Sequence, residues 1–362
     1  MAILHEATKE VICKIVYHGA GKCGKTTSLL YMNHHLPPAQ RGRFVTLETP
    51  TERTLFFDLL PVKAQAGEYK FRFLLFATPG QEYYDASRRL ILKGADAIVF
   101  VVDSQRERMQ DNWEAMELLE KNLKDLGQRM DALPMVLQYN KRDLSNIMPP
   151  EDMERRYNTR KLLSFPAVAR TGEGVYETFL TVAKMALTRL SAPSAEAAMG
   201  PLFRSLVFSA EDAEKLGGML DKLNLEAGLR GSLLVDESSG ILGSRGNVSN
   251  DDAETLGALL ASNFAAAQEL SSNLSSRGFV GLTQRGRDIQ LRAARVDQRR
   301  FLVLVTGRNA ERKALKNAVT YVKGPMAAWL QQLDAVSPNR LDRFHDLFSS
   351  VASLAVAGMR QP

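Results

Sequence analysis

The chain has 362 residues, which is too long for one ordinary core, and its 45% hydrophobic and 24% charged residues exclude a disordered or fibrous protein. A formal net charge of +6 is mild for this length, and without a run of like charges it gives no reason to expect nucleic acid as a partner. The two cysteines, Cys13 and Cys23, fit neither a disulfide framework nor a metal site, which favours a cytoplasmic protein, and no apolar stretch approaches the ~20 residues of a transmembrane helix.

Apolar runs alternate with helix-like patterns from residue 11 to about residue 191. This alternation predicts an α/β fold, with a mostly parallel sheet, helices on both faces and ligands at the carboxyl ends of the strands. The predicted strands are 11–17, 44–47, 71–76, 97–102, 135–139 and 165–168. The predicted helices are 25–35, 84–93, 111–126, 151–157 and 175–190.

The stretch GAGKCGKT, residues 19–26, lies between the first predicted strand and the first predicted helix and matches the pattern G-x-x-x-x-G-K-[ST] of a phosphate loop. Its glycines let the backbone wrap an anion, so that several N–H groups and the helix N-terminus point at phosphate. We expect Lys25 to reach the β- and γ-phosphates and the Thr26 hydroxyl to bind Mg²⁺. The predicted nucleotide contacts of this loop and the next residue are Gly19, Gly21, Lys22, Cys23, Gly24, Lys25, Thr26 and Thr27. The alternative is a glycine-rich turn that matches the pattern by accident.

The polar segment PTERTLFFD, residues 50–58, offers a threonine for the metal and an arginine for the reaction. We choose Thr54 to place its hydroxyl on Mg²⁺ and its amide on the γ-phosphate. Nearby competitors for this role are Thr46, Thr49 and Thr51. Arg53 could supply positive charge to the transferring phosphoryl group, although an arginine in a loop is more often a solvated surface charge.

The segment ATPGQ, residues 77–81, follows the predicted strand 71–76. Gly80 suits an amide contact to the γ-phosphate, and Gln81 suits the orientation of an attacking water. Ala77 stands where a GTPase normally has an aspartate that steadies the metal through its water shell. Asp58 is the candidate to compensate, but the sequence does not place its carboxylate.

The segment NKRD, residues 140–143, follows another predicted strand. Asp143 is expected to accept hydrogen bonds from the N1–H and the exocyclic amine of guanine, a donor pair that adenine lacks. Asn140 is expected to brace this base loop, and the stem of Lys141 to lie over the base. The stretch VARTG, residues 168–172, is expected to give a backbone amide to the guanine oxygen through Ala169 and Arg170, with Arg170 equally compatible with a surface position.

Four segments carry a resemblance to a known family: CKIVYHGAGKCGKTT, TERTLFFDLLP, TPGQEYYDASRRLILKGADAIVFVVDSQ and LQYNKRDL. They resemble the small Ras-like GTPases and, more closely, their MglA branch of bacterial polarity and gliding-motility GTPases, over roughly residues 8–191. The resemblance implies that a residue other than aspartate at position 77 is normal in this branch. It also implies that Arg53 is the intrinsic catalytic arginine and that Gln81 positions the water.

The stretch SAPSAEAAMGP, residues 191–201, is small, polar and bounded by proline, which marks a linker. From residue 209 the predicted order becomes helix, two strands, helix, three strands and helix, which is typical of a small α+β domain. The predicted strands are 232–235, 241–244, 279–284, 288–296 and 301–306. We expect Asn250 or Asp251 to cap the second helix, and a last helix over 310–332 with a kink at Gly324-Pro325.

The segment GSLLVDESSGILGSRG, followed by an alanine-rich helix, resembles the roadblock family and its bacterial MglB-like members, over about 205–334. The expected domains are therefore an MglA-like GTPase domain over 1–192, a linker over 193–203, a roadblock domain over 204–335 and an amphipathic tail over 336–362.

The second half shows no catalytic constellation. Asp236 and Glu237 fall in a predicted hairpin turn, where solvated carboxylates are the default. Small residues on the second helix fit either packing inside the domain or a dimer interface, and the roadblock resemblance favours the dimer: Ala258, Ala261, Ala265, Ala266 and Ala267. The apolar face of the tail is expected to dock on its own chain rather than on a partner or a membrane, and His345 to lie at the surface.

These observations favour a small GTPase switch that binds guanine nucleotide, GTP or GDP, with Mg²⁺ and hydrolyses GTP. Its roadblock half is expected to regulate it and to form a homodimer. We expect polarity or motility effectors as partners, no nucleic acid, and a cytoplasmic protein that is recruited to cell poles. The alternative is a GTP-binding scaffold with little hydrolysis whose roadblock half serves assembly. An ATP-binding phosphate-loop protein is a third possibility, which Asp143 argues against.

Overall fold

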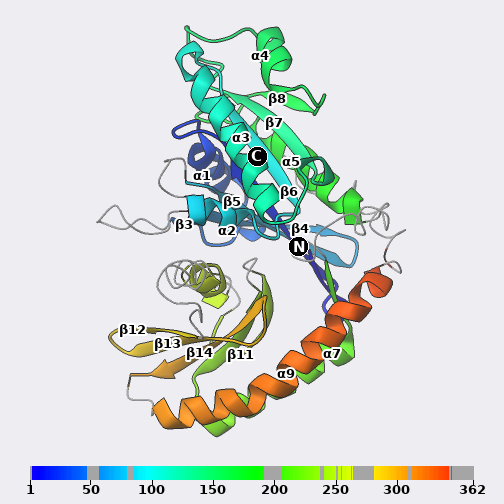
Figure 1. The fold of residues 1–362 in the computed structure, drawn as a ribbon, viewed down its shortest axis with the longest axis vertical. Coiled ribbons are helices and arrows are strands. Elements are labelled where there is room, and N and C mark those ends of the chain that lie inside the picture. The colour runs from blue at the N-terminus through cyan, green and yellow to red at the C-terminus, as the bar shows by residue number, and fades with distance from the viewer. Residues whose placement is uncertain are drawn as a thin grey trace. The chain divides into compact units, whose positions relative to one another are not determined.

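The computed structural model describes residues 2–46, 57–79, 85–190, 205–236, 240–249, 252–253, 255–261, 263, 281–308, 312–341 and 344. The chain divides into two compact units, of which the first is formed mainly by Glu10–Arg204. The second is formed by Ser205–Arg340 together with Ile3–Lys9. Figure 1 labels the helices and strands of each.

The first unit is built on a sheet with the strand order β3-β4-β5-β2-β6-β7-β8. The bounds are Glu10–His18 for β2, Val45–Thr46 for β3, Asp58–Ala66 for β4, Tyr69–Ala77 for β5, Ala97–Asp103 for β6, Met135–Asn140 for β7 and Ser164–Pro166 for β8. Neighbouring strands from β5 to β8 are parallel, whereas β4 is antiparallel to both β3 and β5. The predicted α/β fold with a mostly parallel sheet is confirmed.

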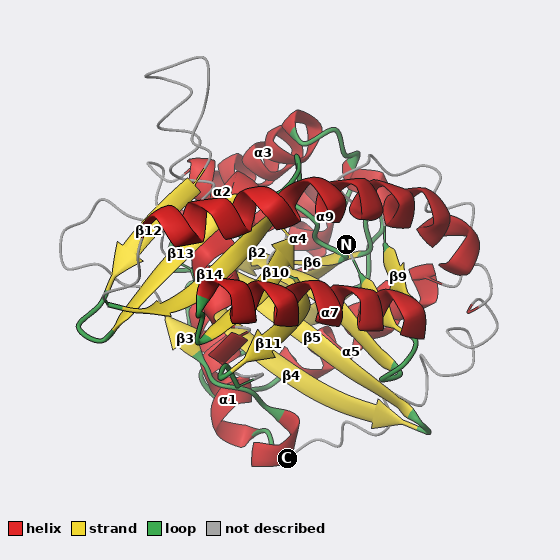
Figure 2. Ribbon diagram, turned by 90° about the horizontal axis from the view of Figure 1, so that it is seen from below, coloured by secondary structure: helices red, strands yellow, loops and turns green. Residues whose placement is uncertain are grey.

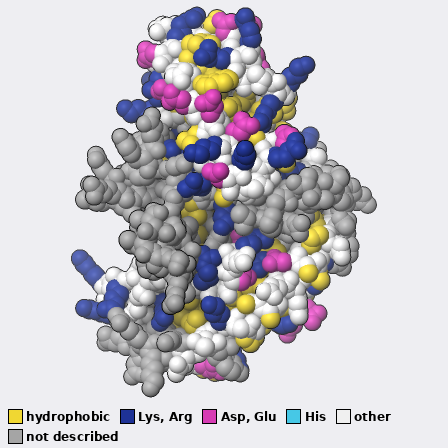
Figure 3. Space-filling view, in the orientation of Figure 1, with side chains coloured by type: hydrophobic (Ala, Val, Ile, Leu, Met, Phe, Trp, Pro, Cys, Tyr) yellow, Lys and Arg dark blue, Asp and Glu magenta, His cyan; other side chains and the backbone are white. Residues whose placement is uncertain are grey.

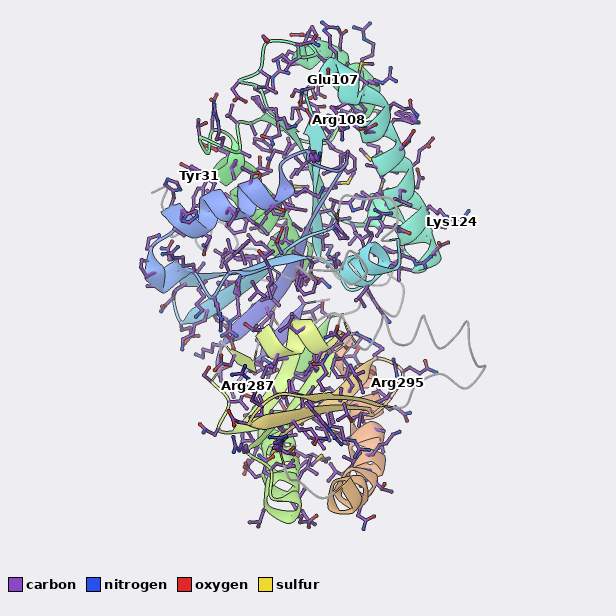
Figure 4. All side chains as sticks on the ribbon, turned by 90° about the vertical axis from the view of Figure 1, so that its left-hand side faces the viewer. Tyr31, Glu107, Arg108, Lys124, Arg287 and Arg295 are labelled. Carbon is purple, nitrogen blue, oxygen red and sulfur yellow. The ribbon has the colours of Figure 1, made fainter. Side chains whose placement is uncertain are left out.

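Helices cover both faces of this sheet. The bounds are Lys25–His35 for α1, Asp85–Leu92 for α2, Met109–Asp125 for α3, Pro150–Tyr157 for α4 and Val175–Leu190 for α5. Three short 3₁₀ turns add η1 (Pro38–Gln40), η2 (Arg106–Arg108) and η3 (Met130–Ala132). Helices α1 and α5 contact each other and the sheet, and in Figure 4 α1 and α3 flank the strands from opposite sides. All seven residues of β6 are buried, as a central strand covered on both faces requires.

Strand β4 is one that the sequence pattern did not indicate. It contains Pro61, which has no N–H for a sheet ladder and is therefore confined to positions near a sheet edge. The next strand, β3, has only two residues, so most of β4 lies along the edge of the sheet. The Pro61 carbonyl still accepts a hydrogen bond from the Gly42 N–H at 2.8 Å.

The second unit holds an antiparallel sheet with the order β11-β10-β14-β13-β12. The bounds are Gly231–Asp236 for β10, Ile241–Gly246 for β11, Gly281–Arg285 for β12, Ile289–Arg295 for β13 and Arg300–Gly307 for β14. Helices α7 (Ala210–Ala227) and α9 (Arg312–Leu341) lie side by side in Figure 2, and the Trp329 indole donates to Asp212 Oδ1 at 3.3 Å between them. Residues 255–261 are helical and contribute Leu260 and Ala261 to the core.

Two short strands also belong to the second unit. Strand β1 (Ile3–His5) pairs in parallel with β9 (Leu206–Phe208), so the start of the chain belongs to the same unit as residues two hundred positions later. The Phe208 ring lies 6.1 Å from the Trp329 ring of α9, edge to face. The N-terminal segment is thus packed as part of this unit.

Two details of the second half differ from the sequence-based expectations. Asn250 and Asp251 lie outside the described residues, and Ser249 caps the second helix because its Oγ accepts the Asp252 N–H at 3.1 Å. Helix α9 does not end at residue 332 but continues through both of its prolines to Leu341. His345 and most of the predicted tail lie outside the described residues.

The expectation that the Asp236 carboxylate is solvated is wrong. It is 2% exposed, and its Oδ2 lies 3.5 Å from Arg299 Nη2 and 3.9 Å from Arg300 Nε. Glu237 lies outside the described residues. The carboxylate at the end of β10 is therefore paired with the partly buried Arg299 and the buried Arg300.

The described part of the alanine stripe packs inside the unit, because Ala258 and Ala261 are 2% and 1% exposed. The remaining alanines, Ala265, Ala266 and Ala267, lie outside the described residues. Among the described helices, none is long and apolar enough to cross a membrane. On the face drawn in Figure 3, basic and acidic side chains are interspersed over the first unit.

Candidate functional site

The phosphate loop, residues 19–26, connects β2 to α1 at the carboxyl end of a central strand. Gly24 caps α1 with φ of 106°, a conformation that favours glycine. A Cβ at this position would lie 2.0 Å from Asn140 Nδ2, at the end of β7. Glycine is therefore needed here both for the turn and for the close approach of two loops.

Lys25 lies under the phosphate loop and is 5% exposed. Its ammonium donates to the Gly19 carbonyl at 2.9 Å and to the Ala20 carbonyl at 2.7 Å, and it lies 3.6 Å from Cys23 Sγ. The loop's own carbonyls thus hold a buried positive charge at its centre. Such a charge is suited to an anionic ligand such as a phosphate group.

Asp58 is brought to the phosphate loop by β4. Its Oδ2 accepts a hydrogen bond from the Thr26 hydroxyl at 2.5 Å, and the residue is 7% exposed. In the sheet Asp58 pairs directly with Ala77 of β5, so its carboxylate stands across the ladder from the position that lacks one. A hydroxyl beside a nearly buried carboxylate is the all-oxygen donor set that Mg²⁺ prefers. The residues present therefore fit magnesium.

Asn140 ties the phosphate loop to the base loop. It is 2% exposed, its amide nitrogen donates to the Cys23 carbonyl at 2.7 Å, and its amide oxygen accepts the Ala169 N–H at 2.8 Å. One side chain thus joins residues 23, 140 and 169, which lie on three separate segments of the chain. This is the bracing role expected for Asn140.

A pocket of about 380 Å³ opens where these loops meet. Its lining consists of Lys22, Gly24, Thr27, Asn140, Lys141, Asp143, Leu144, Ala169 and Arg170. The structure thus brings together eight of the predicted nucleotide contacts, and Leu144 is a lining residue that the sequence motifs did not indicate. Arg170 Nη2 lies 3.4 Å from Asp143 Oδ2 with its side chain 81% exposed, so it is both a pocket and a surface residue.

Lys141 lines the pocket and has φ of 66°, which is unusual for a residue with a side chain. Its ammonium lies 2.6 Å from Asp103 Oδ2 and donates to Gln105 Oε1 at 3.0 Å. Asp103 is 1% exposed and ends β6. The base loop is therefore also fixed to the neighbouring strand.

Tyr31 of α1 packs against the other base-side segment. Gly172 has φ of 89°, and a Cβ there would lie 1.9 Å from the Tyr31 ring, which also stacks on His35 at 3.9 Å between centroids. Figure 4 labels Tyr31 on the outer part of this helix. The motif VARTG contains the glycine but gives no sign of its partner, so the sequence analysis missed this contact.

His18, the last residue of β2, lies directly before the phosphate loop and is 1% exposed. Its Nδ1 is 3.1 Å from the Thr78 hydroxyl. Burial, followed by the nearby charges of Lys25 and Arg88, lowers the pKa of His18 from 6.5 to about 3. The imidazole is therefore neutral at physiological pH and adds no charge beside Lys25.

Four predicted residues lie outside the described part of the chain: Arg53, Thr54, Gly80 and Gln81. Gly19, Gly21, Cys23, Lys25 and Thr26 belong to the described phosphate loop. Within the described residues, no group of three or more histidine, cysteine, aspartate or glutamate side chains could hold a metal ion.

Two family models match the chain. Residues 14–188 match the Ras family, and residues 215–306 match the roadblock/LC7 domain. The two matches fall in the first and the second unit, respectively.

The chain is 47% identical over 191 residues to the mutual gliding-motility protein MglA of Myxococcus xanthus. The aligned region covers 52% of this chain and 98% of that protein. Among solved structures, Myxococcus xanthus MglB is 22% identical with a TM-score of 0.32, over 33% of this chain and 97% of that one. The gliding protein MglB of Thermus thermophilus is 25% identical with a TM-score of 0.32, over 34% of this chain and 93% of that one.

Proposed function

This chain belongs to the Ras family, and on that premise we propose that it is a molecular switch that binds GTP or GDP in the pocket of the first unit and hydrolyses GTP. The observation that carries the proposal is the bridge formed by Asn140. It joins a phosphate loop and two base-side segments around one pocket of about 380 Å³. One buried side chain thus holds the proposed phosphate site and the proposed base site together.

Different pocket residues suit different parts of the nucleotide. Backbone amides of the phosphate loop and the buried ammonium of Lys25 suit the phosphates. Asp143, on the base side, suits the two donors on the edge of guanine, which adenine does not present. The chemistry of the lining thus favours a guanine nucleotide over an adenine nucleotide.

Mg²⁺ would be held by Thr26 and Asp58, with Thr54 as a further proposed ligand. When bound, the ion supplies positive charge to the β- and γ-phosphate oxygens. Asp58 orients the Thr26 hydroxyl through the hydrogen bond described above. We propose that Asp58 takes the part of the carboxylate missing at Ala77.

For hydrolysis we propose Arg53 as the group that stabilises charge on the transferring phosphoryl group and Gln81 as the group that orients the water. The test is single-turnover hydrolysis by Arg53→Ala and Gln81→Leu in the full chain. Each variant should slow the reaction by about 10²- to 10⁴-fold while GTP binding is retained. Unchanged rates would favour the scaffold, which binds GTP stably and uses the second unit for assembly.

We propose that the roadblock half regulates the switch and forms a homodimer. Among the described strands β12 stands at one end of its sheet, and its residues are mostly exposed, so this edge is suited to pairing with a second copy. Sedimentation of the full chain tests the dimer. The hydrolysis rate per molecule, measured across protein concentrations, then distinguishes action within one chain from action between chains.

We propose gliding motility or cell polarity as the process, because the relative that the first unit resembles carries gliding motility in its name. Effector proteins would then bind one nucleotide state. A pull-down with the chain loaded with GTP or with GDP tests this, and partners that bind both states equally would contradict it.

A further inference from the structure

Arg108 lies beside the phosphate loop although it belongs to none of the sequence motifs. It ends the short turn η2, which follows β6, and Figure 4 labels it there next to Glu107. Its Nη2 donates to the Gly21 carbonyl at 2.7 Å, across 87 positions of sequence. Its Nη1 forms an ion pair with Asp111 in the first turn of α3.

The bond to Gly21 fixes the orientation of one peptide group. In a trans peptide the carbonyl and the following N–H point in opposite directions. Because the Gly21 carbonyl faces Arg108, the Lys22 N–H faces away from it. Lys22 is a lining residue of the pocket, and its φ of 63° is a conformation that side chains disfavour. Because this backbone conformation is unfavourable, the Gly21–Lys22 peptide depends more on a hydrogen bond from outside the loop than a peptide in a relaxed conformation would.

We propose that Arg108 is a positioning residue for the nucleotide: it holds the Gly21–Lys22 peptide so that the Lys22 amide faces the phosphates. This inference rests on the proposed function of the same pocket. Asp111 orients the guanidinium, and together the two side chains extend the phosphate loop's support to α3. The alternative is an exposed arginine that only pairs with Asp111, three residues along the helix. The Arg108 side chain is 31% exposed, which fits either role. The 2.7 Å hydrogen bond to the Gly21 carbonyl favours the positioning role.

The test is the rate at which the full chain releases a fluorescent GDP when it is chased with excess unlabelled GDP. Arg108→Ala should release GDP about tenfold faster, because it loses a hydrogen bond made by a charged donor. Arg108→Lys keeps one charged donor within reach and should restore the rate to within about threefold of the parent. Arg106→Ala is the matched control, since it removes the same charge from an exposed position in the same turn.

Asp111→Asn provides a second variant that loosens Arg108 without touching the loop, and it should give an intermediate rate. Equal acceleration in Arg108→Ala and Arg106→Ala would show a general charge effect and overturn the proposal. Release from Arg108→Ala at the parent rate would also overturn it. If the parent chain binds no guanine nucleotide, the proposed function itself fails, and that outcome is distinct because it is seen before any variant is made.

Discussion

Replacement of Asp58 by asparagine tests how this chain manages without an aspartate at position 77. The change removes one negative charge and keeps the shape of a side chain that is 7% exposed and accepts the Thr26 hydroxyl at 2.5 Å. A hydrogen bond to a charged group contributes about 1.5–3 kcal/mol. Because 1.4 kcal/mol corresponds to a factor of ten, this range is roughly 10- to 150-fold in a binding constant.

The assay is GDP release from the full chain, measured over a titration of free Mg²⁺. Asp58→Asn should need about 10- to 150-fold more Mg²⁺ to reach the slow, magnesium-bound rate. The control is Asp152→Asn, which removes a partly exposed carboxylate that pairs with Arg155 on α4. Because Asp58 and Ala77 are direct partners across two strands, the double variant Asp58→Asn/Ala77→Asp should recover part of the loss. A single variant with the parent's magnesium dependence would refute the reasoning.

Two further predictions concern stability. Ile3→Ala removes a side chain that is 1% exposed on β1 and should lower the free energy of unfolding by about 2–5 kcal/mol. Because β1 pairs with β9, hydrogen exchange of the β9 amides should become faster. Unchanged exchange there would show that the two strands do not depend on each other. His18 has its pKa lowered to about 3, so between pH 6.5 and 3 the unfolded chain binds a proton that the folded chain does not. The free energy of unfolding should therefore fall as the pH drops below about 6.5, and His18→Asn should show a weaker dependence, which unfolding in denaturant at several pH values measures.

The parts of the site that the sequence predicted are those whose geometry is local. Lys25 and Thr26 follow Gly24 directly, so the turn that opens α1 also places both side chains. The base loop is similar, because the end of β7 carries Asn140 and Asp143 together. Each motif contains within a few residues the glycine or the polar group that its geometry requires.

The missed parts depend on pairing between distant segments. The position of the Asp58 carboxylate follows from the β4–β5 register, and no pattern around residue 58 contains that register. Tyr31 and Arg108 act on loops 141 and 87 positions away, respectively, through a ring contact and a single hydrogen bond. Strand β1 is only three residues long and finds its partner two hundred positions later, which leaves it without a periodic signal.

Proline lies inside two elements, β4 and α9. In β4 the lack of an N–H is tolerated because the neighbouring strand is very short. In α9 the helix continues through Pro325 and Pro338 although each costs about 3 kcal/mol in a helix interior. Burial of the helix face that carries Trp329 and Leu333, which are 5% and 1% exposed, offsets that cost. Tertiary packing, which a single sequence does not display, decided both cases.

The most direct test of the account is the nucleotide preference of the full chain and of Asp143→Asn. With Mg²⁺ present, fluorescent GDP should be displaced from the parent chain by GDP and not by ADP, with a preference of about 10⁴-fold. Asp143→Asn should lose GDP and gain xanthosine diphosphate, because its amide donates where the carboxylate accepted. Equal displacement by GDP and ADP, or no binding of either at micromolar concentration, would contradict a guanine-nucleotide switch in this pocket.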